Sequence, residues 1–363
     1  MAWAIPPTDL AAVNAAGREL AKRQFPMEGD DVLKTVNHWR SSHAFPLNTF
    51  QVGLRRRALS LDQAIDVAQR IKRLESIHAK LVRGQTSTMR LTQMQDIGGC
   101  RVVFGEIENV FKLVEKYKKS GSKFLHKLKN EKDYINHPKA DGYRCYHLVY
   151  EFNGGHSRTK CYDGLKIEIQ IRTRRQHAWA TAVEAVGIFT GQALKSNQGD
   201  SDWRRFFALM ASAIACMERT PCVPGTPDAK LDLMAEIELL ERKLEVCDKL
   251  SAYRVTLDYV QKKLKKAKYY LVKLDFDAKK VSFNTYGAKQ SQRANIAYTA
   301  LERQVKDGQN VQIVLVSVDS LAALRRAYPN YFLDTGFFSD LIREVLKGNF
   351  PDPIPCEGED SAD

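Results

Sequence analysis

The stretch KIEIQIR, residues 166–172, alternates isoleucines with polar side chains. Successive side chains of a β-strand point to opposite faces of a sheet, so this pattern predicts a strand with one apolar face. The isoleucines would pack on the core, and the opposite face would carry Glu168, Gln170 and Arg172. Taken alone, the pattern fits a solvated outer face as well as the floor of a polar site.

The bulk composition limits the classes of protein to consider. The chain has 363 residues, 44% of them hydrophobic, and a formal net charge of +13. This length suffices for two domains, and the charge favours anionic partners such as nucleotides, RNA or acidic surfaces. No signal peptide or membrane-spanning run is present, so we expect a cytoplasmic protein. The seven cysteines lack metal-binding spacing and indicate reduced thiols.

Hydrophobic periodicity along the chain predicts an α+β fold, with a mixed β-sheet flanked by helices. Thr173 and Gln176 form a capping box that opens a helix directly after the strand of residues 164–172. We expect helices at 8–45, 59–83, 108–120, 173–186, 201–219, 229–265 and 288–306, followed by two final helices. We expect strands at 100–104, 143–152, 164–172 and 311–318, and a β-hairpin at 269–286. A lysine-rich loop should follow residue 120.

The segment TPCVPGTPD, residues 220–228, interrupts this pattern with three prolines and a glycine. Such a cluster predicts a loop, and we place a domain boundary there. The expected organisation is an N-terminal helical segment (1–58), a central domain (59–220), a long helix with a smaller C-terminal α/β domain (229–350) and an acidic tail (351–363).

A basic face lies within RIKRLESIHAKL, residues 70–81. Lys72, Ser76 and Lys80 are spaced four residues apart, so on a helix they would share one face. Two lysines and a hydroxyl in a row could bind a polyphosphate. A solvated basic face is the alternative.

Two acidic residues are candidates for a metal site. Asp96 lies just before a buried strand, and the Gly98-Gly99 pair that follows permits close approach of another group. An acid at this position can cap a loop or supply half of a magnesium site, because Mg²⁺ uses one or two carboxylates together with substrate phosphates. Glu168 is the natural second carboxylate.

The segment KDYINHPKADGYRCYH, residues 132–147, combines lysines with an aromatic strand start. Tyr143 could stack on a nucleobase, or it could simply pack in the fold. His147 shares the strand face of Tyr143, and Lys132 and Lys139 precede them in the loop.

These motifs, in this order, resemble the RelA/SpoT nucleotidyltransferase family. The resemblance rests on RIKRLESIHAKL, DIGGCRVVF, the K-D-Y-I-x-x-P-K-x-D-G-Y-R-x-x-H pattern and E-I-Q-I-R-T followed by H-A-W-A. It covers roughly residues 60–190 and implies a nucleotidyltransferase-like sheet. It also implies a magnesium-dependent pyrophosphokinase that moves the β,γ-diphosphate of ATP to the 3′-hydroxyl of GDP or GTP, giving (p)ppGpp.

The resemblance also implies roles for individual side chains. Asp96 and Glu168 would bind Mg²⁺, and Glu168 would help to deprotonate the attacking hydroxyl. The other residues would bind substrates: Arg70, Lys72, Ser76, Lys80 and Arg101 the ATP, and Lys132, Lys139, Tyr143, His147, Gln170 and Arg172 the acceptor nucleotide.

Several departures leave alternatives open. The chain has no His-Asp dipeptide, so we expect no phosphohydrolase activity. The strand reads Gly-Tyr-Arg-Cys-Tyr-His, where many members have Gly-Tyr-x-Ser-Ile-His, and this affects the choice of acceptor. One alternative is a toxin that pyrophosphorylates the 3′ end of tRNA, with an antitoxin or regulatory partner or a regulatory C-terminal domain. Another is an inactive nucleotide-binding module. A homo-oligomer is compatible with either.

Overall fold

The computed structural model describes residues 3–22, 31–83, 89–119, 124–190, 201–248, 250, 269–275, 280–287, 290–304, 311–317 and 336–354. Three helices open the chain: α1 (Leu10–Lys22), α2 (Asp31–Ser42) and α3 (Ala44–Leu59). Trp39 is buried, and Phe45 packs against the same core.

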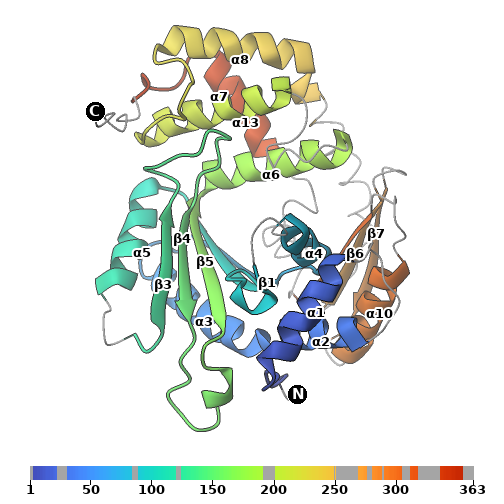
Figure 1. The fold of residues 1–363 in the computed structure, drawn as a ribbon. Coiled ribbons are helices and arrows are strands. Elements are labelled where there is room, and N and C mark those ends of the chain that lie inside the picture. Colours follow the sequence, from blue (N-terminus) through green and yellow to red (C-terminus); the bar gives the residue numbers. More distant parts are fainter. Residues whose placement is uncertain are drawn as a thin grey trace, which may run out of the picture.

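A five-stranded mixed sheet forms the centre of the molecule (Figure 1), so the predicted α+β class is confirmed. Its strand order is β1-β2-β5-β4-β3. Strands β2 and β5 are parallel, and the other neighbouring pairs are antiparallel. The bounds are β1 (Asp66–Ile71), β2 (Gly98–Phe104), β3 (Lys127–Asp133), β4 (Tyr146–Glu151) and β5 (Lys166–Thr173).

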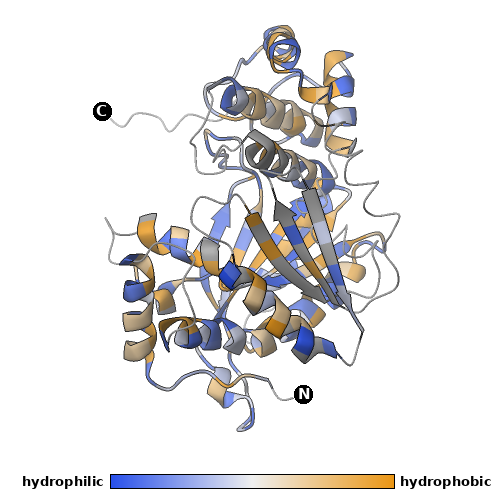
Figure 2. Ribbon diagram, turned by 90° about the vertical axis from the view of Figure 1, so that its right-hand side faces the viewer, coloured by the Kyte–Doolittle hydropathy of each residue, from blue (hydrophilic) through white to orange (hydrophobic). Residues whose placement is uncertain are grey.

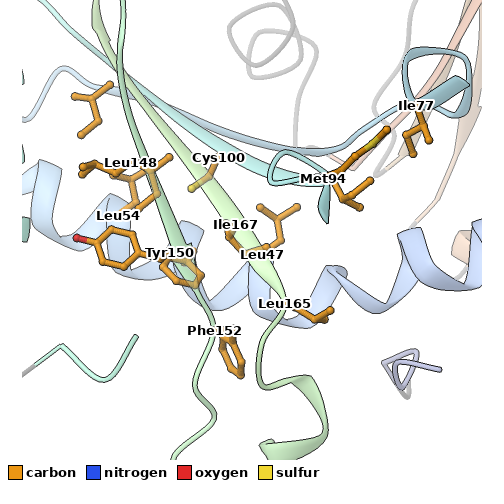
Figure 3. Packing of buried hydrophobic residues seen from close by; sticks show 14 of the residues in the cluster. Leu47, Leu54, Ile77, Met94, Cys100, Leu148, Tyr150, Phe152, Leu165 and Ile167 are labelled. Carbon is orange, nitrogen blue, oxygen red and sulfur yellow. The ribbon is translucent and has the colours of Figure 1, made fainter. Parts of the chain in front are cut away.

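One face of this sheet is apolar and buried. The isoleucines of β5 have no exposed surface, and Leu148 and Tyr150 of β4 lie on the same core. Helix α3 and helix α5 (Ile107–Lys119) supply the facing residues. Figure 3 shows Leu47 and Leu54 of α3 beside Ile167, Cys100 and the β4 side chains. This core fixes the sheet so that the alternate residues of each strand face the other way.

A second helical layer lies beyond the end of the sheet at which β5 leads into α6 (Figure 1). It contains α6 (Arg174–Thr190), α7 (Ser201–Glu218), α8 (Lys230–Leu244) and α13 (Gly336–Leu346), which share one apolar cluster. The predicted capping box of α6 is confirmed, because the backbone N–H of Gln176 donates to Thr173 Oγ1 at 3.1 Å and the Thr173 N–H to Gln176 Oε1 at 3.3 Å. Figure 2 shows hydrophobic and hydrophilic residues interspersed in the helices at the top of the molecule; α8 buries one side, with Leu233, Ile237 and Leu240, whereas α7 is buried almost throughout.

A separate three-stranded antiparallel sheet has the order β7-β6-β8. The predicted hairpin is confirmed in β6 (Tyr269–Asp275) and β7 (Lys280–Tyr286). Strand β8 (Val311–Ser317) pairs with the other edge of β6, and α10 (Ser291–Gln304) packs on this sheet. In Figure 1 this unit lies beside α1, α2 and helix α4 (Leu74–Arg83).

The single helix predicted at 59–83 is wrong. Residues 66–71 form β1 and pair with β2, and α4 begins only at Leu74. Val67 and Ile71 of β1, and Ile65 just before it, pack against the core. Over so short a stretch, the spacing of these apolar residues is compatible with a helix as well as with a strand. The segment forms a strand because it pairs with β2. Lys72 therefore precedes the helix that carries Ser76 and Lys80, so the three do not share a helix face.

Two further predictions need correction. The lysine-rich loop contains β3, which pairs with β4 at the edge of the sheet. The helix predicted at 229–265 is broken at Glu245, which has left-handed backbone angles. Residues 251–268 lie outside the described residues, as do 318–335 and the tail from 355.

The loop at 220–228 contains no helix or strand, as predicted. The apolar cluster of the second layer nevertheless includes α7 before this loop and α8 and α13 after it. Helix α13 thus packs on this layer rather than on the three-stranded sheet, and the domain division stays an interpretation. No helix in the described part of the chain is long and apolar enough to span a bilayer.

Candidate active site

A cavity of about 660 Å³ lies between the polar face of the five-stranded sheet and helices α6 and α7. Glu168, Gln170 and Arg172 of β5 all line it. The alternation of residues 166–172 therefore separates a core face from a face that lines a cavity.

The strand register aligns the polar residues of this floor in rows. One row runs across all five strands as Ala68, Arg101, Gln170, His147 and Lys132. In the next row, Gly99 lies between Arg70 and Glu168. Residues far apart in the chain thus become neighbours because each has the same parity on its strand.

Gly99 leaves the floor open between Arg70 and Glu168. A Cβ added there would meet only the Glu168 carbonyl oxygen, at 3.9 Å, which is an ordinary contact. We expect Gly99→Ala to fold and keep the pyrophosphokinase activity that the RelA/SpoT resemblance implies, and Gly99→Leu to fold but lower that activity by roughly 10²-fold or more, because its side chain would occupy the place of substrate. Thermal unfolding and initial rates of both variants test this. Equal activity of the leucine and alanine variants would contradict the open floor.

Asp96 is held by two lysines. Lys72 Nζ lies 2.8 Å from Asp96 Oδ2, and Lys80 Nζ lies 2.9 Å from Asp96 Oδ1. Burial alone would raise the pKa of Asp96, but the two ammonium groups lower it to about 2. Burial also lowers the pKa of Lys72, and the charge of Asp96 opposes this change. The Asp96 carboxylate is therefore ionised at neutral pH.

This lowered pKa predicts a pH dependence of stability. A carboxyl whose pKa is lower in the folded state stabilises the fold above its unfolded pKa, which is near 4, and that contribution is lost as the pH falls towards 2. The change corresponds to about 2 kcal/mol. Urea unfolding at pH 5 and pH 2 should show a larger loss of unfolding free energy for the wild type than for Asp96→Asn. The same loss in both proteins would contradict the strong coupling of Asp96 to its lysines.

Glu168 is the centre of a second polar network. Its Oε1 accepts a hydrogen bond from His147 Nδ1 at 2.9 Å, and its Oε2 accepts one from Gln170 Nε2 at 2.7 Å. The Tyr143 hydroxyl lies 2.9 Å from the other ring nitrogen of His147. Sequence reasoning placed His147 near the acceptor, but the structure shows it as the direct partner of Glu168.

The network favours a charged pair at its centre. Burial raises the pKa of Glu168, but the hydrogen bond and charge of His147 and the hydrogen bond from Gln170 together outweigh it, so the net shift is downward. Burial likewise lowers the pKa of His147, yet its polar neighbours raise it well above the usual value. Burial raises the pKa of Tyr143 to about 12, so the phenol is neutral near neutral pH. Glu168 is therefore the partner that carries the negative charge.

The loop that precedes β4 forms one wall of the cavity. Lys139, Asp141 and Tyr143 line it from this loop. The Asp141 carboxylate accepts the backbone N–H of Tyr143 at 2.9 Å, which is a turn-stabilising contact. Lys139 Nζ lies 4.3 Å from the ring centre of Tyr134 and 5.8 Å from that of Tyr143. Tyr143 thus reaches the cavity while its ring edges contact Tyr134 and His147.

Most of the candidate site residues meet at this cavity. Four do not line it: Ser76, Lys80, Lys132 and His147. Of these, Lys80 and His147 contact the two acids directly, whereas Lys132 is exposed on the edge strand. The wall formed by the second helical layer was not predicted from the sequence; it includes Trp179, Arg204, Arg205 and Phe207.

The two acids suit Mg²⁺ as a donor set. Both line the same cavity, and the charge of Asp96 raises the pKa of Glu168, so the two carboxylates lie within electrostatic reach of each other. Among the described residues, no group of three His, Cys, Asp or Glu side chains could hold a metal. Two carboxylates match the sites in which substrate phosphates supply the remaining oxygen ligands of Mg²⁺.

Comparison with known proteins identifies the class of this central region. Residues 69–190 match the family model described as a region found in RelA / SpoT proteins. This range contains both acids, the loop before β4 and the whole of β5. Residues 69–190 are therefore a RelA/SpoT region.

Individual relatives match this same part of the chain. GTP pyrophosphokinase YwaC of Bacillus subtilis is 34% identical over 115 residues, which are 31% of this chain and 52% of that protein. GTP pyrophosphokinase YjbM of the same organism is 31% identical over 118 residues, which are 32% of this chain and 52% of that protein. The chain thus spans about half the length of each of these relatives.

Solved structures show a more distant likeness. The crystal structure of small alarmone synthetase 2 from Bacillus subtilis has a TM-score of 0.40 at 23% identity, covering 49% of this chain and 91% of that one. Small alarmone synthetase 1 from the same organism, bound to its product pppGpp, also has a TM-score of 0.40, at 20% identity, covering 59% of this chain and 96% of that one.

Proposed function

We propose that this protein is a pyrophosphokinase that transfers the β,γ-diphosphate of ATP to the 3′-hydroxyl of an acceptor nucleotide, with GDP or GTP as the first candidates. The observation that carries the proposal is the meeting of Asp96 and Glu168, from separate segments, at one cavity of nucleotide size. The match of residues 69–190 to a RelA/SpoT region and the names of the relatives support the same reaction.

The charge of the cavity suits a polyphosphate. Seven lysines and arginines line it, against three aspartates and glutamates. Arg172 is only 4% exposed, its Nε has no hydrogen-bond partner, and no ion pair to it is found among the described residues. A buried guanidinium without an anion is costly. An anionic ligand would supply the missing partner and so lower that cost.

On the donor side, Lys72 and Lys80 would hold the ATP phosphates. Both now donate to Asp96, and both have the ammonium group that binds phosphate oxygens. Arg70 and Arg101 line the same part of the floor from β1 and β2. Magnesium bound by Asp96 and Glu168 would neutralise charge on the phosphates and make the β-phosphorus more electrophilic.

On the acceptor side, Glu168 would receive the proton of the attacking hydroxyl. It is ionised, and His147 and Gln170 fix both of its oxygens, so its orientation is set before substrate binds. Tyr143 would stack on the acceptor base, and Lys139 and Arg172 would contact its phosphates. Ser76 and Lys132, which lie away from the cavity lining, would act only at its margins.

An acceptor panel tests the proposal. Purified full-length protein is incubated with γ-labelled ATP, Mg²⁺ and, separately, GDP, GTP, AMP and bulk tRNA. We expect label in GDP or GTP. Label only in tRNA would contradict a free guanine nucleotide as acceptor and would support the toxin alternative. Label in no acceptor, with ATP still bound, would contradict the transferase and would leave a nucleotide-binding module.

A further inference from the structure

Arg40 of α2 joins three parts of the molecule that are distant in sequence. Its side chain is 7% exposed. Its Nε donates to the backbone carbonyl oxygen of Lys72 at 3.0 Å, its Nη1 to Asn37 Oδ1 at 2.6 Å and its Nη2 to the Tyr298 hydroxyl at 3.0 Å. A planar guanidinium with several fixed donors can hold three acceptors at once, whereas a lysine ammonium is a single point charge.

Arg40 contacts Lys72 at the end of β1. The Lys72 backbone N–H donates to the Ile97 carbonyl at 2.7 Å, so its nitrogen continues the pairing of β1 with the chain before β2. Its carbonyl oxygen is held by Arg40, and its side chain reaches Asp96. The backbone of this lysine is thus fixed on both sides, immediately before α4 begins. The position of Nζ in the cavity follows from the position of that backbone.

The contact with Tyr298 comes from α10, in the unit built on the three-stranded sheet. The Tyr298 ring packs against the core of that unit, which contains Leu271, Val311 and Ile313. The same ring lies 5.9 Å from the guanidinium carbon of Arg40. Tyr298 therefore holds Arg40 both by its hydroxyl and by its ring face.

We propose that Arg40 is a positioning residue for Lys72, and that Tyr298 completes the donor side of the cavity from the C-terminal unit. The ligand whose binding depends on this chain of contacts is the polyphosphate of ATP. This inference rests on the proposed role of Lys72 in ATP binding. It gives the three-stranded unit a function at the active site although none of its described residues lines the cavity.

The test measures binding of a non-hydrolysable ATP analogue with Mg²⁺ to the full chain by calorimetry. Tyr298→Phe removes one oxygen and keeps the ring. We expect roughly 3- to 10-fold weaker binding, because one hydrogen bond to a buried charged group is lost. Arg40→Lys should weaken binding further. Tyr286→Phe is the matched control: it makes the same change in a tyrosine packed on the same small core. It should bind as the wild type does.

A double-mutant cycle separates positioning from a general structural role. In a Lys72→Ala background, Tyr298→Phe should cause no further loss of affinity, because the route through Lys72 has been removed. An undiminished effect in that background would overturn the inference, as would a Tyr298→Phe protein that binds normally, whether or not its melting temperature falls. Binding is measured without turnover, so a failure of the proposed transfer reaction would be seen separately.

Discussion

Replacing Glu168 by glutamine should lower pyrophosphate transfer by roughly 10²- to 10⁴-fold while leaving the protein folded. Glutamine has nearly the same shape, so the contacts of β5 with the core are unchanged. It has no negative charge for a metal ion and cannot accept a proton from the attacking hydroxyl. His147 would also lose a charged hydrogen-bond partner that contributes to raising its pKa, so the pKa of His147 should be lower than in the wild type.

Glu151→Gln is a suitable control for this variant. Glu151 lies on the neighbouring strand β4 and pairs with Lys129 at 3.1 Å, away from the cavity lining. It should keep wild-type rates. The comparison is made by initial rates at saturating ATP and by thermal unfolding of each protein. Full activity in a folded Glu168→Gln protein would show that the reaction does not depend on this carboxylate.

Gly142→Ala should have the second large effect, which combines a loss of stability with a displacement of the loop that precedes β4. Gly142 has φ +85°, and an added Cβ would lie 2.8 Å from the Ala211 Cβ, 3.0 Å from Trp179 Cζ2 and 3.2 Å from the Phe207 carbonyl oxygen. The left-handed backbone and the overlap together should cost roughly 2 to 5 kcal/mol of unfolding free energy. Because Tyr143 follows directly, relief of the overlap would displace it from His147.

Gly164→Ala separates the two causes. Gly164 has nearly the same backbone angle, φ +86°, but nothing lies within 4 Å of an added Cβ. It should lose only the backbone contribution, about 1 to 2 kcal/mol, and should keep its affinity for acceptor. Denaturant unfolding of both variants tests the difference. Equal destabilisation would mean that the packing of the loop against α6 and α7 contributes little.

The sequence predicts the floor of the site better than its walls. Residues 166–172 alternate so regularly that both faces of β5 can be predicted from the pattern. Asp96 lies just before β2, whose first residues pair with the start of β5. Tyr143 and His147 were expected on one face of a strand at 143–152, but β4 begins at Tyr146, so Tyr143 reaches His147 from the loop before the strand. The features that were predicted correctly depend on local hydrophobic periodicity and on helix capping, and both are present in the folded chain.

The errors come from contacts that local sequence does not encode. Strands β1 and β3 are the two edges of the sheet, and each forms by pairing with a partner distant in sequence. Strand β3 contains five charged residues and has no apolar alternation, so its pattern predicts a loop. The wall residues Arg204 and Arg205 appear on a helix beyond the matched region, and only packing of α7 above the sheet brings them to the cavity.

The link from Lys72 through Arg40 to the C-terminal unit also depends on contacts that the local sequence does not encode. Arg40 and Tyr298 are 258 residues apart, and neither belongs to a motif. Their contact exists because α2 and α10 lie side by side in the folded chain (Figure 1). Such a bridge can be inferred from a structure but not from periodicity or spacing.

The most direct measurement follows both ends of ATP in one reaction. Parallel incubations with α-labelled and γ-labelled ATP, Mg²⁺ and the accepting nucleotide show which bond breaks. We predict that the α label appears in AMP and the γ label in the acceptor, in equal amounts, and that Asp96→Asn and Glu168→Gln each lower both products strongly and together. Recovery of the α label as ADP, or undiminished transfer by either folded variant, would contradict a diphosphate transfer directed by these two carboxylates.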